Sequence, residues 1–202
     1  MQNIAALVFP GFELLDLFGP LQMFGMMKSD FQVHIVAESK AVVESNAGPS
    51  ILAEVDFDDA IDHDLILVPG GMGTRQEINN TRLINWIAKA ADEAEIIMSV
   101  CTGGALLAKS GVLDGRRATT NKMAFEWVRS QSTAVNWEKQ ARWIEDGNLF
   151  TSSGVSAGMD MSLAVIARLH GKKQARKVAT WSEYEWHEDS SYDPFAKIHG
   201  LV

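Results

Sequence analysis

Cys101 is the only cysteine of the chain, and its position makes it a candidate nucleophile. It follows an apolar run typical of a buried strand, Glu95–Val100, and precedes Thr102–Ala108, which has the composition of a helix. A side chain at such a strand-to-helix turn points out over the end of the sheet, often from a strained backbone. Gly103 and Gly104 leave room for a substrate near the first helical turn. The alternative interpretation is a small buried side chain that only packs, as free cysteines commonly do.

The helix that follows Cys101 bears on the ionisation of the thiol. The positive end of a helix favours the thiolate over the thiol. We therefore expect the pKa of Cys101 to lie below its ordinary value of about 8.5. An ionised carboxylate nearby would oppose this shift, whereas a protonated carboxyl group that donates to sulfur would favour it.

Asp16 is the candidate partner of this thiol, because a carboxylate is unusual in an apolar stretch such as Leu14–Pro20. If Asp16 faces Cys101, burial would raise its pKa and fit it for proton transfer. The alternative is a structural cap on a broken helix. Glu13 lies about one turn earlier and either shares the same face or is simply solvated.

The segment Pro69–Thr74 is rich in glycine and follows another apolar run, Leu65–Val68. The backbone amides of Gly70 and Gly71 can face a bound group in such a loop and form an oxyanion hole. The alternative is a tight turn that binds nothing. The segment is not a phosphate-binding loop, because it lacks the terminal Lys-Ser/Thr pair.

The histidines offer no obvious partner for Cys101. One lies in a predicted strand, one in an acidic loop, one at a helix end and two in the tail: His34, His63, His170, His187 and His199. A conventional cysteine–histidine pair is therefore not visible in the sequence.

Apolar runs alternate with amphipathic stretches along the first half of the chain. The runs Ile4–Phe9, Phe31–Val36, Leu65–Val68 and Glu95–Val100 are continuous, like strands of a parallel sheet covered by helices on both faces. The alternation predicts one domain over residues 1–202 with an α/β fold, a doubly wound sandwich around a mostly parallel sheet. Ligands bind such a sheet outside the carboxyl ends of its strands, where the three segments described above all fall.

Some further elements are predicted in less detail. Glu13–Met27 has the pattern of a helix that Gly19-Pro20 should kink or break. Val42–Val43 and Ile51–Val55 suggest a short antiparallel excursion. A final helix is expected over Lys172–Trp186, followed by an irregular tail.

The composition is that of an ordinary soluble globular protein, with 47% hydrophobic and 22% charged residues in a chain of 202. The net charge of -8 argues against binding to nucleic acid or to an anionic membrane. A lone cysteine forms no disulfide within the chain and excludes metal sites built on several thiolates. We expect a cytoplasmic protein; that it acts on a small molecule with no metal ion and no organic cofactor is implied by the resemblance described below.

Five segments together resemble the class I glutamine amidotransferase-like superfamily, in its branch of PfpI-type proteins. They are Val8–Pro20, Val68–Gly73, Ser99–Gly103, Gly115–Thr120 and Thr151–Asp160. The resemblance covers nearly the whole chain. It implies a flavodoxin-like fold, a reactive cysteine at the strand-to-helix turn, and a homodimer.

Within this superfamily the chain is most similar to the isocyanide (isonitrile) hydratases. The similarity lies in the Cys-Thr-Gly turn that begins at Cys101 and in the Leu-Asp-Leu-x-Gly-Pro stretch around Asp16. It implies that Asp16 partners Cys101, that Thr102 contributes at the turn, and that amides near Gly71 orient water or stabilise charge. The implied reaction adds water to an isocyanide and gives an N-formamide. Asn121 stands where many relatives have a histidine, which weakens protease and amidase interpretations.

Two alternatives would use the same cysteine. One is glyoxalase or deglycase chemistry on reactive aldehydes, in which Glu13 would have to act as the glutamate that such relatives carry beside the cysteine. The other is a non-enzymatic sensor, in which Cys101 is oxidised or binds a metabolite.

Overall fold

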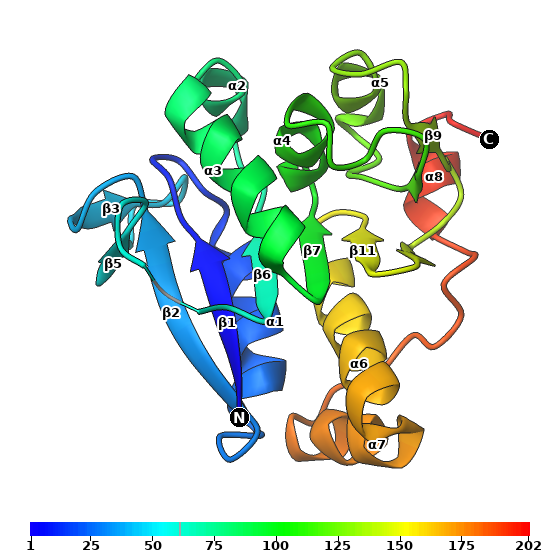
Figure 1. The fold of residues 1–202 in the computed structure, drawn as a ribbon. Helices are drawn as coiled ribbons and strands as arrows, with labels where there is room; N and C mark the ends of the chain where they lie inside the picture. Colours follow the sequence, from blue (N-terminus) through cyan, green and yellow to red (C-terminus); the bar gives the residue numbers. More distant parts are fainter. Residues whose placement is uncertain (61) are drawn as a thin grey trace.

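The computed structural model of the chain describes residues 1–60 and 62–202. Its centre is a seven-stranded sheet in the order β10-β11-β7-β6-β1-β2-β5 (Figure 1). All neighbours in this sheet are parallel except β10 and β11, which form an antiparallel hairpin at one edge. The strands are β1 (Gln2–Leu7), β2 (Phe31–Ala37), β5 (Val55–Asp56), β6 (Leu65–Val68), β7 (Ile96–Val100), β10 (Trp143–Asp146) and β11 (Leu149–Ser152).

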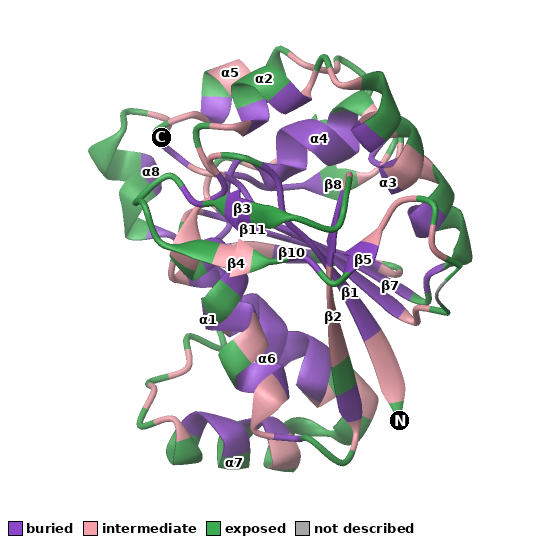
Figure 2. Cartoon of the chain, turned by 90° about the vertical axis from the view of Figure 1, so that its left-hand side faces the viewer, coloured by how far each residue is buried: buried purple, intermediate pink, exposed green. Residues whose placement is uncertain are grey.

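Helices cover both faces of the sheet, which confirms the predicted doubly wound α/β sandwich with a mostly parallel sheet. One layer holds α1 (Leu14–Gly25), α6 (Ala157–His170) and α7 (Lys172–Trp181), with α6 packed between the other two. The opposite layer holds α2 (Thr74–Glu77), α3 (Thr81–Glu93), α4 (Gly103–Lys109) and α5 (Phe125–Arg129). Strands β6 and β7 are buried along their whole length, as expected where both faces are covered (Figure 2).

Short elements complete the chain. An antiparallel pair, β3 (Val42–Glu44) and β4 (Ser50–Leu52), forms the expected excursion. Val55 does not belong to that excursion as predicted, because it pairs with Val36 in the main sheet. The remaining elements are β8 (Arg117–Ala118), β9 (Asn136–Trp137) and α8 (Pro194–Ile198).

Gly19-Pro20, predicted to kink or break the first helix, does not break it, because α1 continues through both residues. Proline removes one hydrogen bond of the helix interior. Tight packing against α6 offsets this loss: Gly19 and Pro20 are buried, and they lie against Met159 and Gly158. The contact with α6 therefore determines that the helix continues through Gly19 and Pro20, which the sequence pattern alone did not predict.

The predicted final helix is too long at its carboxyl end. It ends at Trp181, and Glu183 then adopts a left-handed backbone with φ 48°. Trp186 instead reaches back to α6, where its indole N–H donates to the carbonyl of Asp160 at 3.1 Å. The tail expected to be irregular contains α8, whose first turn is capped by the Asp193 carboxylate accepting from the Phe195 amide. In the part of the chain that the structure describes, no helix is long and apolar enough to cross a membrane.

Candidate active site

The carboxyl ends of three neighbouring strands bring the predicted site segments together. Strand β1 leads to the loop that precedes α1, β6 leads to Pro69–Gly73, and β7 leads to Cys101. The loop before α1 contacts the loop after β6 directly, since the Glu13 amide donates to the carbonyl of Gly70 at 2.8 Å. The expected edge of the sheet therefore carries the candidate residues.

Cys101 occupies a strained turn. Its φ is 57°, in the left-handed region that side chains other than glycine rarely adopt. Hydrogen bonds hold its backbone: the amide donates to the carbonyls of Ser152 and Ser153 at 3.2 and 3.1 Å, and the Thr120 hydroxyl donates to its carbonyl at 2.7 Å. Its exposed fraction is 8%. These constraints keep the turn in the conformation expected for a nucleophile.

Asp16 lies in the first turn of α1 and is completely buried. Its Oδ2 atom accepts a hydrogen bond from the Gly70 amide at 3.0 Å. Its Oδ1 atom makes no hydrogen bond of ordinary geometry with the described residues. Burial raises the pKa of Asp16 to about 7, and the charge of Glu13 adds to that rise. Asp16 can therefore both hold and release a proton near neutral pH.

The thiol of Cys101 and the carboxyl group of Asp16 are close enough to shift each other's pKa. Burial raises the pKa of Cys101 most, and the negative charge of Asp16 raises it further. The amide and hydroxyl of Thr102 oppose this rise. The prediction that the pKa of Cys101 lies below its ordinary value is therefore wrong, because desolvation and the carboxylate outweigh the helix terminus.

Gly70 permits the close approach of the two groups. A Cβ atom on Gly70 would lie 2.6 Å from the Thr102 nitrogen, 2.7 Å from Thr102 Oγ1 and 2.8 Å from Asp16 Oδ2. The neighbouring Gly71 has φ 129°, and a Cβ atom there would lie 2.4 Å from the Gly11 carbonyl oxygen and 2.6 Å from the Glu13 nitrogen. Any side chain at either position would separate the elements of the site.

The predicted oxyanion-hole amides already have partners within the protein. The Gly70 amide donates to Asp16, and the Gly71 amide donates to Thr102 Oγ1 at 3.0 Å. Their action on a substrate stays a prediction. What they do in this structure is orient the carboxyl group and the hydroxyl beside Cys101.

Comparisons with known proteins identify the family of the chain. The sequence profile described as the DJ-1/PfpI family matches residues 2–168. The chain belongs to the DJ-1/PfpI family. It is 34% identical to the isonitrile hydratase of Pseudomonas putida over 182 residues, which cover 90% of this chain and 78% of the relative. It is also 33% identical to a solved THiJ/PfpI family protein from Pseudomonas syringae, with a TM-score of 0.84 over 91% of this chain and 75% of that one.

Another relative is a transcriptional regulator. The HTH-type regulator GbdR of Pseudomonas aeruginosa is 27% identical over 91% of this chain, which corresponds to 51% of the regulator. The DJ-1/PfpI fold is thus present in proteins with different roles. Family membership fixes the architecture, and the site and its chemistry have to be argued from this chain's own residues.

Within this family site, the charged neighbour of the cysteine is a carboxylate and not an imidazole. Among the described residues, Asp16 is the titratable side chain that shifts the pKa of Cys101. No histidine of the described residues is among the groups that shift the pKa of Cys101. The His170 ring, for example, packs edge-on against Phe31 with their centroids 5.4 Å apart. Glu13 is half-buried, and its charge acts on Asp16.

Two threonines of the site escaped sequence analysis. Thr120 holds the Cys101 carbonyl, and Thr74 contacts both Thr102 and Gly71. Both are completely buried. The bond from Thr74 to Gly71 spans only three residues, but Thr102 lies 28 residues from Thr74 and Cys101 lies 19 residues from Thr120, so no local spacing could have identified these two contacts.

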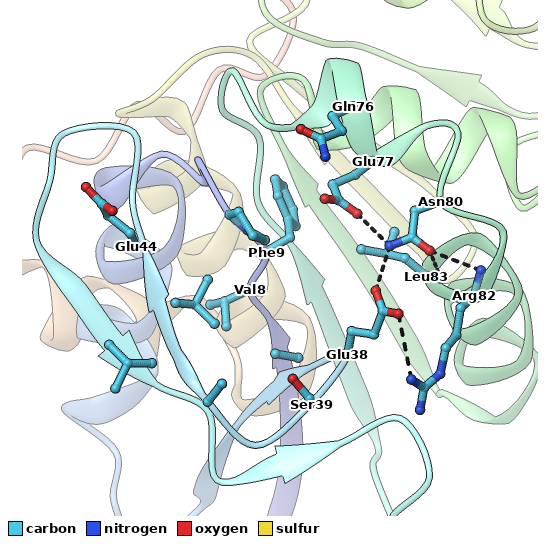
Figure 3. A pocket seen from close by; sticks show the side chains of 15 residues that line it. Val8, Phe9, Glu38, Ser39, Glu44, Gln76, Glu77, Asn80, Arg82 and Leu83 are labelled. Carbon is cyan, nitrogen blue, oxygen red and sulfur yellow. Dashed lines mark hydrogen bonds and ion pairs between the residues drawn. The ribbon is translucent and has the colours of Figure 1, made fainter.

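A cavity of about 700 Å³ opens beside this site at the ends of β1 and β2 (Figure 3). The Asn80 amide donates there to Glu38 and Glu77 at 2.7 and 2.8 Å. Neither Cys101 nor Asp16 lines it. A smaller cavity of about 250 Å³ is lined by Ser153, whose carbonyl accepts from the Cys101 amide, and by Asn121, Val155, Phe195 and His199.

Proposed function

We propose that this protein adds water to an isocyanide and releases the N-substituted formamide, with Cys101 as nucleophile and Asp16 as proton carrier. The observation that carries the proposal is the buried Asp16, with a pKa raised to about 7, beside a cysteine on a strained turn. A carboxyl group with this pKa exists in both protonation states near neutral pH. The isonitrile hydratase relative, at 34% identity over 90% of the chain, supports the choice of substrate class.

The first step adds the S–H group of Cys101 across the terminal carbon of the isocyanide. The Asp16 carboxylate takes the thiol proton as sulfur attacks, so the charge that opposes ionisation of Cys101 disappears in the same event. Asp16 then gives this proton to the carbon that sulfur has attacked. The product is a thioimidate, with a new C–S bond, a new C–H bond and a C=N double bond.

The second step hydrates the thioimidate. Asp16, again ionised, accepts a proton from water while the water oxygen bonds to the carbon, and it passes this proton to the nitrogen. The C–S bond then breaks, the carbonyl forms, and the remaining hydroxyl proton returns to sulfur through Asp16. One water is consumed, the formamide leaves, and both side chains regain their starting states.

The neighbouring groups have supporting roles in this proposal. Thr102 supplies an amide and a hydroxyl that favour the thiolate during attack. Gly70 and Gly71 orient Asp16 and Thr102 through their amides. No step requires a metal ion, an organic cofactor or an imidazole.

The decisive experiment follows p-nitrophenyl isocyanide and its formamide by chromatography and mass spectrometry. We expect turnover by the parent and none by Cys101→Ala or Cys101→Ser, because a hydroxyl lacks the nucleophilicity of a thiolate at neutral pH. Asp16→Asn should still react with iodoacetamide at Cys101 but turn over at least about 10²-fold more slowly. Asp193→Asn is the matched control, since it replaces another completely buried carboxylate that instead caps α8.

Several outcomes would count against the proposal. Normal turnover by Asp16→Asn would reduce Asp16 to a structural group. Turnover of methylglyoxal but not of the isocyanide would favour aldehyde chemistry. No turnover of either substrate, with Cys101 readily oxidised by mild peroxide, would favour a sensor, the role suggested by the similarity to a transcriptional regulator.

We also propose that the protein acts as a cytoplasmic homodimer. Leu15 and Phe18 on α1 and Met72 in the loop after β6 are exposed apolar side chains on the segments that form the site. Contact with a second copy would remove these side chains from water. Sedimentation analysis of the parent and of a Phe18→Lys variant tests this: a parent that is monomeric at micromolar concentration would contradict it.

A further inference from the structure

The cavity at the ends of β1 and β2 has the size of a ligand pocket and carries a buried charge on its wall (Figure 3). Its volume of about 700 Å³ lies within the range of about 300–1,000 Å³ that is typical of small-molecule sites. Glu77, the last residue of α2, lines it with an exposed fraction of only 6%. The proposed hydration of an isocyanide uses neither this cavity nor this carboxylate.

The Asn80 side chain holds this carboxylate in place. Its Oδ1 atom caps α3 by accepting from the amides of Arg82 and Leu83, both at 3.2 Å. The cap fixes the orientation of the side chain, so Nδ2 faces two carboxylates and donates to Glu77 Oε2 at 2.8 Å and to Glu38 Oε2 at 2.7 Å (Figure 3). Two like charges are therefore held at the cavity wall on either side of one neutral amide group.

The charge of Glu77 has no counterion within the part of the chain that the structure describes. Its carboxylate accepts from the neutral Asn80 amide at Oε2, and Oε1 has no hydrogen-bond partner among the described residues. The nearby Arg82 is engaged elsewhere: it lies 3.7 Å from Glu38 and forms its shorter bond, at 2.6 Å, with Asp58. A buried carboxylate without a cation is costly. A cationic ligand that reaches Oε1 from the cavity would remove this cost.

The remaining lining residues indicate the chemical class of such a ligand. The apolar part of the wall consists of Val8, Phe9, Ala41, Val43 and Leu83, among others. No group of three His, Cys, Asp or Glu side chains among residues 1–60 and 62–202 is arranged to hold a metal ion. The free lone pairs of Glu77 Oε1 need N–H donors, which a protonated amine has and a quaternary ammonium lacks. The apolar wall suits a hydrocarbon chain attached to that amine.

We propose that this cavity binds a small protonated amine, with its ammonium group bonded to Glu77 and its hydrocarbon chain against the apolar wall. The proposal does not depend on the proposed hydration, because neither Cys101 nor Asp16 lines the cavity. The amine is therefore a second ligand of the protein. It lies against Phe9 and Pro10, which lead into the loop before α1, and against α2, which follows the glycine loop after β6.

The test is isothermal titration calorimetry with n-hexylamine at pH 7, where an alkylamine is protonated like a lysine side chain. We expect the parent to bind this probe and Glu77→Gln to bind it at least about tenfold more weakly, because the ammonium loses a charge-assisted hydrogen bond. The glutamine keeps an oxygen for Asn80, so the wall itself should persist. Glu145→Gln is the control for loss of one negative charge, since Glu145 pairs with Arg168 and does not line the cavity.

Two further probes separate the charge from the hydrocarbon chain. Hexanol has the same chain without a charge, and hexyltrimethylammonium has the charge without an N–H donor. Both should bind the parent at least about tenfold more weakly than hexylamine. Ala41→Trp, at an exposed position of the lining, should also weaken hexylamine binding, because the indole would occupy the cavity while Glu77 stays unchanged.

Cys101→Ala should bind hexylamine like the parent, and this result distinguishes the cavity from the candidate active site. If Glu77→Gln fails to fold, as judged by circular dichroism, the comparison of hexylamine with hexanol and the Ala41→Trp variant decide the question. No binding of hexylamine by the parent, equal binding by a folded Glu77→Gln, or equal affinity for hexanol would overturn the proposal. Loss of binding in Cys101→Ala would also overturn it, because the amine would then occupy the active site. None of these measurements requires turnover of an isocyanide.

Discussion

Replacing Asp16 by asparagine should destabilise the protein at acid pH and stabilise it at alkaline pH. The pKa of this carboxyl group is raised from its ordinary value of 3.8 to about 7 in the folded protein, chiefly by burial. The folded state therefore binds the proton more tightly than the unfolded chain does. The contribution of Asp16 to stability is complete below about pH 4 and is lost as pH rises to about 7. Asparagine is neutral throughout and has no such dependence.

The size of the effect follows from the shift. A change of about three pKa units corresponds to about 4 kcal/mol, at about 1.4 kcal/mol per unit. Asparagine has a cost of its own, because its NH₂ group replaces one carboxyl oxygen and an oxygen is needed at the Gly70 amide. The NH₂ group then stands where Oδ1 has no hydrogen-bond partner among the described residues, at about 1–3 kcal/mol independent of pH. The variant should therefore be less stable than the parent near pH 4 and more stable near pH 8.

Urea unfolding followed by tryptophan fluorescence measures both proteins at each pH. The quantity of interest is the difference in unfolding free energy between parent and variant, in which the titrating groups common to both proteins cancel. We expect this difference to change by up to about 4 kcal/mol from pH 4 to pH 8. The change should persist in a Cys101→Ala background, because burial and not the thiol is the largest cause of the raised pKa. A difference that stays constant with pH would show that Asp16 titrates like an exposed carboxyl group and would refute the proposed proton transfer.

Two further predictions concern the composition and the geometry of the site. Replacing the five histidines one at a time by Asn or Gln should leave isocyanide turnover within a few-fold of the parent, and a loss of about 10²-fold or more at any folded variant would reveal a missed cysteine–histidine pair. Gly70→Ala should lower turnover at least about 10²-fold, because its Cβ would lie within 2.8 Å of Thr102 and Asp16 and displace the groups that move protons. Gly25→Ala is its control, since a Cβ there has no neighbour within 4 Å, and similar losses in both variants would remove the steric argument.

The sheet, and the edge of it at which Cys101 lies, could be predicted from strong local patterns, whereas the pairing of Cys101 with Asp16 was implied only by the resemblance to a known family. Continuous apolar runs mark the buried strands, and the carboxyl ends of parallel strands lie at one edge of the sheet. The course of α1 through Pro20 could not be predicted in this way. It depends on the contact with Gly158 and Met159, which follow in the sequence only much later.

The pKa of the Cys101 thiol could not be predicted from the sequence, for a different reason. The sequence places Cys101 before a helix, and that position by itself favours the thiolate. Burial and the charge of Asp16, which raise the pKa of Cys101 instead, are properties of the assembled site. Thr74 was missed for a similar reason: besides its bond to Gly71, three residues earlier, its hydroxyl contacts Thr102, which lies in a different segment of the chain.

The pairing of a thiol with a carboxylic acid suits the proposed reaction better than a thiol with an imidazole would. A cysteine–histidine pair rests as thiolate and imidazolium, so it offers a nucleophile that is already charged. The raised pKa of Cys101 and the pKa of about 7 at Asp16 keep the proton on sulfur until a substrate carbon can accept electron density. An isocyanide needs both a nucleophile and a proton at the same carbon atom. A pair that moves one proton from sulfur to carboxylate to carbon delivers both, and the buried Asp16 between Gly70 and Cys101 is placed to do so.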